Sequence, residues 1–320
     1  MFTMKYLGID VGGTNIAVGI VDEDNNLIAK ASNKTPVPCT EEVFCDCVVK
    51  TSFEAMEKAG VTLEELPWIG LGCPGTINRA TGIVEFSNNL GYSNFPVKKM
   101  LEERFNGKEV IIENDANAAA YGEYQAGALK GADNAVAITL GTGVGSGIII
   151  DHKIYSGNNF AAGEMGHHVI VFNGRQCNCG RKGCWERYAS ATGLIITTKE
   201  AMEKADKNSP IWQLVDGDID RVSGRTAFDA MRAGDPVGKQ VVDEYIAYLG
   251  CGLVNVINTF QPDILCIGGG ICNEGETLLA PLREYVEREQ YSMNSTKKTV
   301  LCRAKLGNDA GIIGAALLGK

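Results

Sequence analysis

Short apolar runs alternate with segments of helical periodicity along most of the chain. Three such runs stand near the start, and a turn signal at residues 24–26 separates the second from the third. We expect them to be strands, at residues 6–10, 16–21 and 27–31. A helix-periodic segment follows at residues 40–59, with Thr40 as a candidate N-cap and Gly60 at its end. The pattern predicts a three-stranded meander followed by a helix.

The alternation continues to the end of the chain. We expect further strands at residues 68–73, 109–112, 135–140, 148–150, 263–267 and 300–303. We expect further helices at residues 96–105, 118–128, 187–205, 226–233, 237–260, 276–288 and 310–318. Residues 78–92 and 209–225 are rich in turn formers, and we expect loops there. Strands that alternate with helices are typical of an α/β protein.

One part of this pattern occurs twice. Residues 9–22 and 138–151 both read as strand, Gly-rich turn and strand, at a constant offset of 129 residues. A repeat of this size implies two similar domains. The chemistry is not repeated, because Thr139 stands at the position that matches Asp10. No low-complexity linker separates the halves, so we expect them to meet across a cleft.

Size and charge narrow the class of protein. The chain has 320 residues, enough for two domains, and a net charge of −9 without a basic run. This charge disfavours nucleic-acid binding, which needs clustered Lys and Arg. No apolar stretch approaches the ~20 residues of a membrane span, and the first strand starts too early to leave room for a signal peptide. Since the 11 cysteines are odd in number and mostly apolar in setting, we expect a reducing, cytoplasmic location without membrane attachment.

Three cysteines form a group unlike the other eight. Cys177, Cys179 and Cys184 lie in a polar, Gly- and Arg-rich segment without helix or strand periodicity, and His167 lies upstream of them. Three unrelated buried thiols are the alternative, but buried thiols usually lie on apolar elements. Three thiols and an imidazole are a tetrahedral zinc ligand set with no open position. We therefore predict a structural Zn²⁺, with His168 as the competing imidazole.

Two Gly-rich turns follow strands in the repeated pattern. The first, after Asp10, can receive phosphates and their magnesium through N–H groups, a hydroxyl and a carboxylate. A plain hairpin turn explains its glycines equally well. Two such turns facing each other would hold a nucleoside triphosphate from both sides. Neither a Walker A motif nor GxGxxG is present, which disfavours P-loop and Rossmann sites.

Two other positions have both a structural and a functional interpretation. Asp115 follows a strand and precedes an Ala-rich helix, where it can cap the helix or act as a general base at the carboxyl end of a sheet. The glycines 268–270 after a strand permit close approach of a flat ligand such as adenine, or simply a flexible connection. Asn88 and Asn89 are explained by turn chemistry alone.

Together these motifs resemble the ROK family of bacterial sugar kinases, repressors and related proteins, along the whole chain. The turns at residues 10–14 and 140–143 are similar to its phosphate loops, and Asn114-Asp115 is similar to its catalytic pair. Residues 164–186 resemble its zinc signature, and residues 268–270 its adenosine motif. The resemblance implies an α/β, two-lobed actin-like ATPase and hexokinase (ribonuclease H-like) fold with a ligand cleft. We expect a small lobe, 1–116 plus 305–320, and a large lobe, 117–304, with zinc segment 167–186.

The same resemblance assigns roles to individual residues. Asp115 would be the catalytic base. The sugar would be contacted by Gly75, Asn89, Asn114, Asp115, Glu164, His167 and Glu186. ATP and Mg²⁺ would be bound by Asp10, Gly12, Gly13, Thr14, Gly141, Thr142, Gly143, Gly268, Gly269 and Gly270. Zn²⁺ would be bound by His167, Cys177, Cys179 and Cys184. His168 departs from the apolar residue expected after His167, and the spacing and the family motif favour His167 as the ligand.

The glucokinase branch of the family is the most similar, through residues 113–120 and 89–92. It implies an ATP-dependent transferase of carbohydrate metabolism that phosphorylates the 6-hydroxyl of glucose, in a homodimer or homotetramer. The alternatives are a kinase for mannose, fructose, N-acetylglucosamine or N-acetylmannosamine, or a non-catalytic sugar sensor. The repressors of the family have a helix-turn-helix before this fold, and here a strand is expected from Tyr6 onward.

Overall fold

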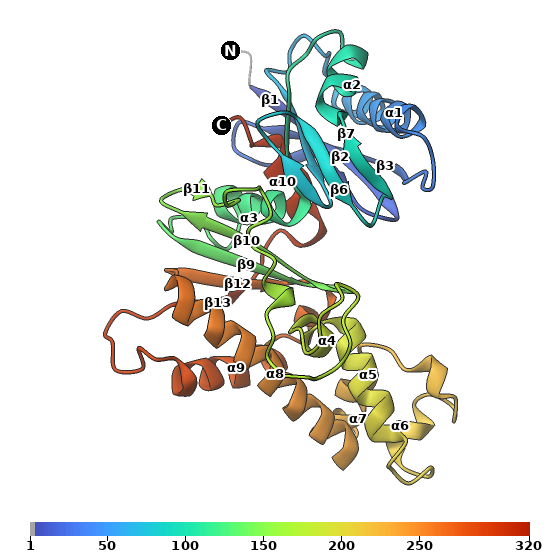
Figure 1. Cartoon of the computed structure of the whole chain (residues 1–320), viewed down its shortest axis with the longest axis vertical. Coiled ribbons are helices and arrows are strands. Elements are labelled where there is room, and N and C mark those ends of the chain that lie inside the picture. Colours follow the sequence, from blue (N-terminus) through green and yellow to red (C-terminus); the bar gives the residue numbers. More distant parts are fainter. Residues whose placement is uncertain (1–3) are drawn as a thin grey trace. The chain divides into compact units, whose positions relative to one another are not determined.

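The structure is a computed structural model that describes residues 4–320 (Figure 1). The chain forms two compact units. The first unit contains the residues up to Ala137 and the segments Gly147–Gly163 and Ala304–Lys320. The second unit contains Ile138–Ser146 and Glu164–Arg303. The division into lobes expected at residues 116 and 304 stays a prediction.

A five-stranded sheet lies at the centre of the first unit, in the order β3-β2-β1-β4-β8. The first three strands form the predicted antiparallel meander, and β4 pairs in parallel with both β1 and β8. The carboxyl ends of β1, β4 and β8 therefore meet at one edge. The strands are β1 (Lys5–Val11), β2 (Asn15–Asp22), β3 (Leu27–Lys34), β4 (Ile69–Cys73) and β8 (Val110–Asn114).

The helix predicted at residues 40–59 is confirmed as α1 (Glu41–Ala59). The Thr40 side chain accepts a hydrogen bond from the Val43 amide, and Gly60 ends the helix with a φ of 62°. Side chains such as Phe44 and Val48 are buried in the core of the first unit. The remaining helices of this unit are α2 (Val97–Arg104), α3 (Asp115–Ala126) and α10 (Ala310–Ala316).

The loop expected at residues 78–92 is wrong. A three-stranded antiparallel sheet runs through this region, in the order β5 (Thr76–Asn78), β6 (Ile83–Ser87) and β7 (Tyr92–Phe95), with turns between the strands. These strands have three to five residues each, and their apolar residues are too few to stand out among Asn, Ser and Gly. The side chains that reach the core, such as Val84 and Phe95, are fully buried.

The C-terminal helix α10 packs on the first unit's sheet and on α3, which it contacts although the two lie far apart in the sequence (Figure 1). Gly8 and Gly70 are register partners on β1 and β4. A Cβ at Gly8 would lie 2.0 Å from the Ile312 carbonyl oxygen, and one at Gly70 would lie 1.7 Å from that of Ala315. These glycines let the backbone of α10 lie directly on the strands.

A second five-stranded sheet has the order β11-β10-β9-β12-β13. Its strands are β9 (Ala135–Leu140), β10 (Val144–Ile150), β11 (Lys153–Ile154), β12 (Ile264–Gly268) and β13 (Val300–Arg303). β12 and β13 run parallel, with Cys266 opposite Cys302. The strands predicted in both copies of the repeat are thus present. The two copies lie in different sheets.

The helices of the second unit pack around the long helix α8 (Pro236–Phe260). The single helix predicted at residues 187–205 is wrong, because Ser190 interrupts it and caps a second one by accepting from the Gly193 amide. The predicted loop at 209–225 contains a short helix. The helices are α4 (Glu186–Ala189), α5 (Ala191–Met202), α6 (Pro210–Gln213), α7 (Thr226–Arg232) and α9 (Glu276–Glu289).

Trp185 fixes the start of α4 in the second unit. The side chain is 1% exposed and its Nε1–H donates to the Tyr248 carbonyl oxygen of α8, at 3.0 Å. A Cβ at Gly252 would lie 2.0 Å from the indole ring, so α8 accepts the ring only because Gly252 has no side chain. The next residue, Glu186, is one of the predicted sugar ligands.

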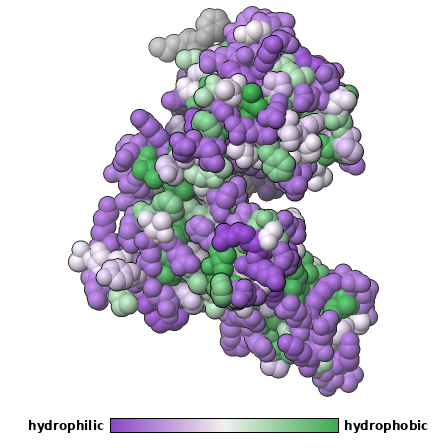
Figure 2. Space-filling model, in the orientation of Figure 1, coloured by the Kyte–Doolittle hydropathy of each residue, from purple (hydrophilic) through white to green (hydrophobic). Residues whose placement is uncertain are grey.

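The visible face of the molecule is largely hydrophilic, with hydrophobic residues scattered over it (Figure 2). Among residues 4–320, no helix is both long enough and apolar enough to span a membrane.

Candidate active site and metal centre

In the first unit, predicted site residues gather where β1, β4 and β8 end. Asp10 of β1 is the register partner of Gly72 on β4, and Asn114 ends β8 opposite Cys73. A Cβ at Gly72 would lie 3.2 Å from the Ala118 Cβ, so α3 packs closely on β4 at this glycine. Carboxyl ends of parallel strands are a common location of ligand sites in α/β proteins.

Asn114, not Asp115, caps helix α3. Its Oδ1 accepts hydrogen bonds from the amides of Ala116 at 2.9 Å and Asn117 at 3.1 Å. Its Nδ2 donates to the Gly75 carbonyl oxygen at 3.1 Å. Of the two roles considered for Asp115, the cap therefore belongs to its neighbour, and Asp115 is the first residue of the helix.

Asp10 is a buried carboxyl group in an unusual electrostatic setting. Burial, together with the charge of Asp115, raises the pKa of Asp10 to about 7, and the charge of Lys30 opposes both effects. The carboxylate also lies against Gly311, where a Cβ would be 2.5 Å from its Oδ2. Two carboxylates that disfavour each other's charge at the end of a sheet are well suited to a cation between or beside them.

The first glycine turn is held by a residue that the sequence analysis did not single out. The Thr35 hydroxyl donates to the Gly12 carbonyl oxygen at 2.6 Å, and the Thr35 amide donates to the Thr14 carbonyl oxygen at 2.9 Å. Thr35 follows β3 directly, and its position after a strand gives no sequence signal of this contact.

The second glycine turn contacts Glu186 within the second unit. The Val144 amide donates to Glu186 Oε2 at 3.1 Å, and a Cβ at Gly143 would lie 2.3 Å from the same oxygen. The Thr192 hydroxyl donates to the Thr142 carbonyl oxygen at 2.8 Å. The structure thus brings a predicted phosphate turn and a predicted sugar ligand into direct contact, and it adds Thr192, which sequence reasoning missed.

The glycines after β12 lie beside the same turn. Gly269 has a φ of 102°, and a Cβ there would lie 2.1 Å from the Leu140 carbonyl oxygen. Only glycine fits this position, on account of both its backbone conformation and the space. The second unit therefore joins residues 268–270 to the end of β9, where the turn at 141–143 begins.

The four predicted zinc ligands come together in the second unit. One ligand atom from each of His167, Cys177, Cys179 and Cys184 lies within 4.8 Å of all the others. The Cys179 and Cys184 sulfurs are 3.6 Å apart, and Cys177 Sγ lies 3.7 Å from His167 Nδ1. Gly180 and Gly183, with φ values of 91° and 80°, supply the tight turns.

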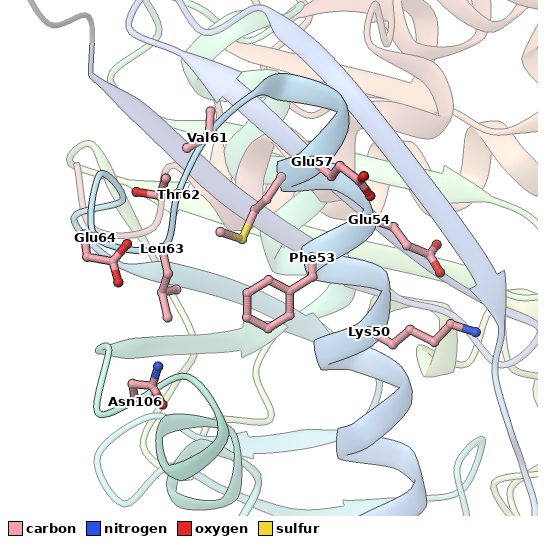
Figure 3. Close-up of a pocket in the computed structure, with 10 residues that line it drawn as sticks. Lys50, Phe53, Glu54, Glu57, Val61, Thr62, Leu63, Glu64 and Asn106 are labelled. Carbon is pink, nitrogen blue, oxygen red and sulfur yellow. The ribbon is translucent and has the colours of Figure 1, made fainter.

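His167 also connects this cluster to Glu164. Its other ring nitrogen, Nε2, lies 3.9 Å from Glu164 Oε2. His168 lies outside the ligand group and instead lines a depression of about 530 Å³ with residues of α8. Another depression, of about 650 Å³, lies between α1 and the segment after it, where Phe53 and Leu63 project (Figure 3). No predicted site residue lines either one.

Comparison with known proteins identifies the family. The sequence model of the ROK family matches residues 6–320. The chain belongs to the ROK family. A glucokinase of Streptomyces coelicolor is 38% identical over 315 residues, which are 98% of this chain and 97% of that protein.

Two solved ROK structures establish the fold. A ROK glucokinase of Streptomyces griseus, solved in complex with glucose and AMPPNP, has a TM-score of 0.80 and 36% identity, covering 98% of each chain. A ROK hexokinase of Thermus thermophilus has a TM-score of 0.81 and 32% identity, covering 98% of this chain and 97% of that one. The predicted α/β fold of the actin-like ATPase and hexokinase class is confirmed.

The predicted site residues thus form one set in each unit of this ROK protein. The first unit holds Asp10, Gly12, Gly13, Thr14, Gly75, Asn89, Asn114 and Asp115. The second holds Gly141, Thr142, Gly143, Glu164, His167, Glu186, Gly268, Gly269, Gly270 and the three cysteines. Asn89 lies in the turn between β6 and β7. The roles assigned to these residues stay predictions.

Replacing Asp10 by Asn is expected to stabilise the magnesium-free protein, more so at high pH. The pKa of Asp10 is about 7 in the folded chain against an ordinary value of 3.8, so the folded state binds an extra proton between these values. Stability from this group falls as the pH rises through that window, and the whole cost is present above it. We expect a gain of roughly 2–4 kcal/mol at pH 8 and less than about half of that at pH 5. Urea unfolding at both pH values measures it, and an equal gain at both would contradict the assignment.

Proposed function

We propose that this ROK protein is an ATP-dependent hexokinase of glucokinase type, which phosphorylates the 6-hydroxyl of glucose. The observation that carries the proposal is the match of 98% of the chain to a ROK glucokinase solved with glucose and AMPPNP. The geometry agrees, because Asp115 starts a helix at the carboxyl edge of a sheet, beside the Asn114 bond to Gly75.

In this proposal Asp115 takes the proton of the sugar 6-hydroxyl. The 6-oxygen then forms a bond to the γ-phosphorus while the bond to the bridging oxygen breaks and ADP leaves. Such transfer needs positioning and neutralisation of charge more than covalent help from the protein. The amides of the turns at residues 12–14 and 141–143 receive the phosphates, and residues 268–270 receive the adenosine. Mg²⁺, held by Asp10 through water, would neutralise the phosphoryl charge.

The sugar is held by acceptors for its hydroxyl groups. Asn114, Glu164, His167 and Glu186 offer carboxylate, amide and imidazole atoms, and Gly75 and Asn89 lie in turns that approach the sugar. A pyranose presents several neighbouring hydroxyl donors, which paired carboxylates accept well. Glu186 is already oriented by the Val144 amide, so little freedom is lost when it binds.

Zinc is the metal that suits the cysteine cluster. Three thiols and one imidazole within 4.8 Å of one another fit its tetrahedral preference, and Zn²⁺ would hold the loop by coordinate bonds. Burial and the neighbouring thiols raise the pKa of Cys184 to about 12, so a positive ion is needed to keep this sulfur as thiolate. With Nδ1 near the sulfurs, His167 turns Nε2 toward Glu164 and the sugar.

We further infer a cytoplasmic homodimer or homotetramer with a small lobe of residues 1–116 plus 305–320, by analogy with the family. The alternative functions keep the same residues. A kinase for mannose, fructose or an N-acetylhexosamine would differ only near C2 of the sugar, where a small change shifts preference by roughly 10–200-fold. A sugar sensor would bind the sugar without turning over ATP.

The first test is ADP release with Mg²⁺ and ATP on glucose, mannose, fructose, N-acetylglucosamine and N-acetylmannosamine. We expect the highest kcat/KM on glucose. A preference for an N-acetylated sugar would keep the chemistry and change the substrate. Zinc-loaded, folded protein that is inactive on the whole panel but binds one of the sugars in calorimetry would favour the sensor.

Changing Asp115 to Asn is expected to lower turnover on the preferred sugar by about 10²–10⁴-fold, because the amide cannot accept the hydroxyl proton. The KM for ATP should change little. Asp133→Asn, an exposed acid of the same unit, serves as the control. Turnover of the Asp115→Asn variant close to wild type would eliminate the general-base role.

The purified protein is expected to contain one zinc ion per chain, and Cys184→Ser to lose it. Because metal binding contributes directly to folding, the variant should also melt at least about 5 °C lower. Elemental analysis and a thermal melt measure the two effects. Cys251→Ser, a thiol of α8 outside the cluster, should keep both zinc content and melting temperature. A wild-type protein that takes up no zinc would contradict the metal assignment.

A further inference from the structure

The first unit contains an ion pair that no proposed role has used, between a buried carboxylate and a partly exposed arginine. Glu113, the residue before Asn114 on β8, is 1% exposed. Its Oε2 lies 3.0 Å from Arg79 Nη1. Arg79 follows β5 directly, so it belongs to the segment that starts at Gly75.

A carboxylate buried near the end of a strand requires a physical explanation. Burial raises the pKa of Glu113, and the charge of Arg79 acts against that rise. Buried charges are stable only when they are paired and hydrogen-bonded, and an aliphatic side chain would pack at the end of β8 at lower cost. Burying the charge of Glu113 therefore costs free energy, which points to a role of the pair beyond stability.

The hydrogen bonds of Glu113 indicate that use. Its other oxygen, Oε1, accepts from the Asn114 amide at 2.9 Å and from Asn117 Nδ2 at 3.1 Å. These two donors lie on either side of Asp115 along the chain. Glu113 thus holds the backbone before the candidate base and a side chain on the first turn of α3 after it.

Arg79 connects the same junction to the neighbouring segment. The Asn114 side chain donates to the Gly75 carbonyl oxygen, and the ion pair adds a second link a few residues farther along. The backbone of Gly75 lies closely against β6, because a Cβ there would lie 2.2 Å from the Phe86 carbonyl oxygen. The start of the small sheet and the start of α3 are therefore fixed to each other at two points.

We propose that Arg79 and Glu113 are positioning residues, which together hold Asn114 and Asp115 in register with the Gly75 segment for the sugar. The inference rests on the proposed function for its kinetic part only. Neither side chain is assigned a contact with the sugar or with ATP. Arg79 acts through Glu113, and Glu113 acts through the amide of Asn114 and the side chain of Asn117.

The kinetic test compares wild type with Arg79→Ala, Arg79→Lys and, as a control, Arg104→Ala. Arg104 pairs with the exposed Asp46 in the same unit, so the control removes an arginine from an ion pair that includes no residue of β8 or β5. A misplacement of about 1 Å costs about 10²-fold in rate, so we expect Arg79→Ala to lose about 10–100-fold in kcat/KM for glucose. The KM for ATP should stay within about twofold. Arg79→Lys, which keeps the charge, should recover most of the lost kcat/KM. The control Arg104→Ala should lose no kcat/KM.

A second readout does not depend on the enzymatic activity. The amides of Ala116 and Asn117 donate to the Asn114 cap, and their hydrogen exchange reports whether the cap is closed. We expect exchange at these amides to be at least about tenfold faster in Arg79→Ala. If wild type has no hexose kinase activity, the proposed function fails, and this measurement still tests the positioning role.

The double variant Arg79→Ala/Glu113→Gln covers the case in which Arg79→Ala does not fold. It leaves no unpaired buried charge, so it should melt close to wild type while remaining slow on glucose. The proposal is overturned if the folded double variant has wild-type kinetics and exchange. It is also overturned if Arg79→Ala raises the KM for ATP in the same proportion as it lowers kcat/KM for glucose, because that would be a general disturbance of the unit.

Discussion

The structure of the first unit depends on keeping carboxylates at a buried edge of its sheet. Glu113 lies near the end of β8 with almost no access to water, Asp10 lies partly buried near the end of β1, and Asp115 follows at the start of α3. Each is tolerated for a different physical reason. Glu113 has an arginine and two donors, whereas Asp10 has a distant lysine and remains poorly compensated. A site that keeps one charge compensated and another in need of a cation is organised for phosphoryl chemistry.

In the second unit the organising feature is close packing against glycines, which have no side chain. Gly143 lies under the carboxylate of Glu186, and Gly269 lies against the end of β9. Gly252 makes room for Trp185, the residue before Glu186. The glycines of the predicted phosphate-binding turn and adenosine motif therefore also serve packing within the unit. A larger residue at Gly143 or Gly269 would disturb both at once.

Regular elements with local signals could be predicted from the sequence. Thr40 and Gly60 bound α1 as expected, and the meander and the long helix α8 follow from the apolar pattern. The cluster of three cysteines and His167 follows from spacing and from the family motif. The sheet of β5, β6 and β7 was missed because its strands depend on partners rather than on periodicity. The Asn114 cap and the break at Ser190 are local capping interactions, but neighbouring polar residues offer competing caps. The pairing of Arg79 with Glu113 depends on three-dimensional proximity that adjacent residues do not encode. The family motifs predicted a site at Asp115, but they did not predict the residues that hold Asp115 in position.

The packing of α10 on Gly8 and Gly70 has a consequence for how the protein is made. The first unit requires residues 304–320, which the ribosome adds only after the whole second unit. The strands of the meander therefore leave the ribosome long before α10, the helix that packs on them. Until α10 is synthesised, β1 and β4 lack this contact. Both segments of the second unit, Ile138–Ser146 and Glu164–Arg303, precede residue 304, so this unit has no such delay. During synthesis the later part of the chain can therefore complete its core before the earlier part does.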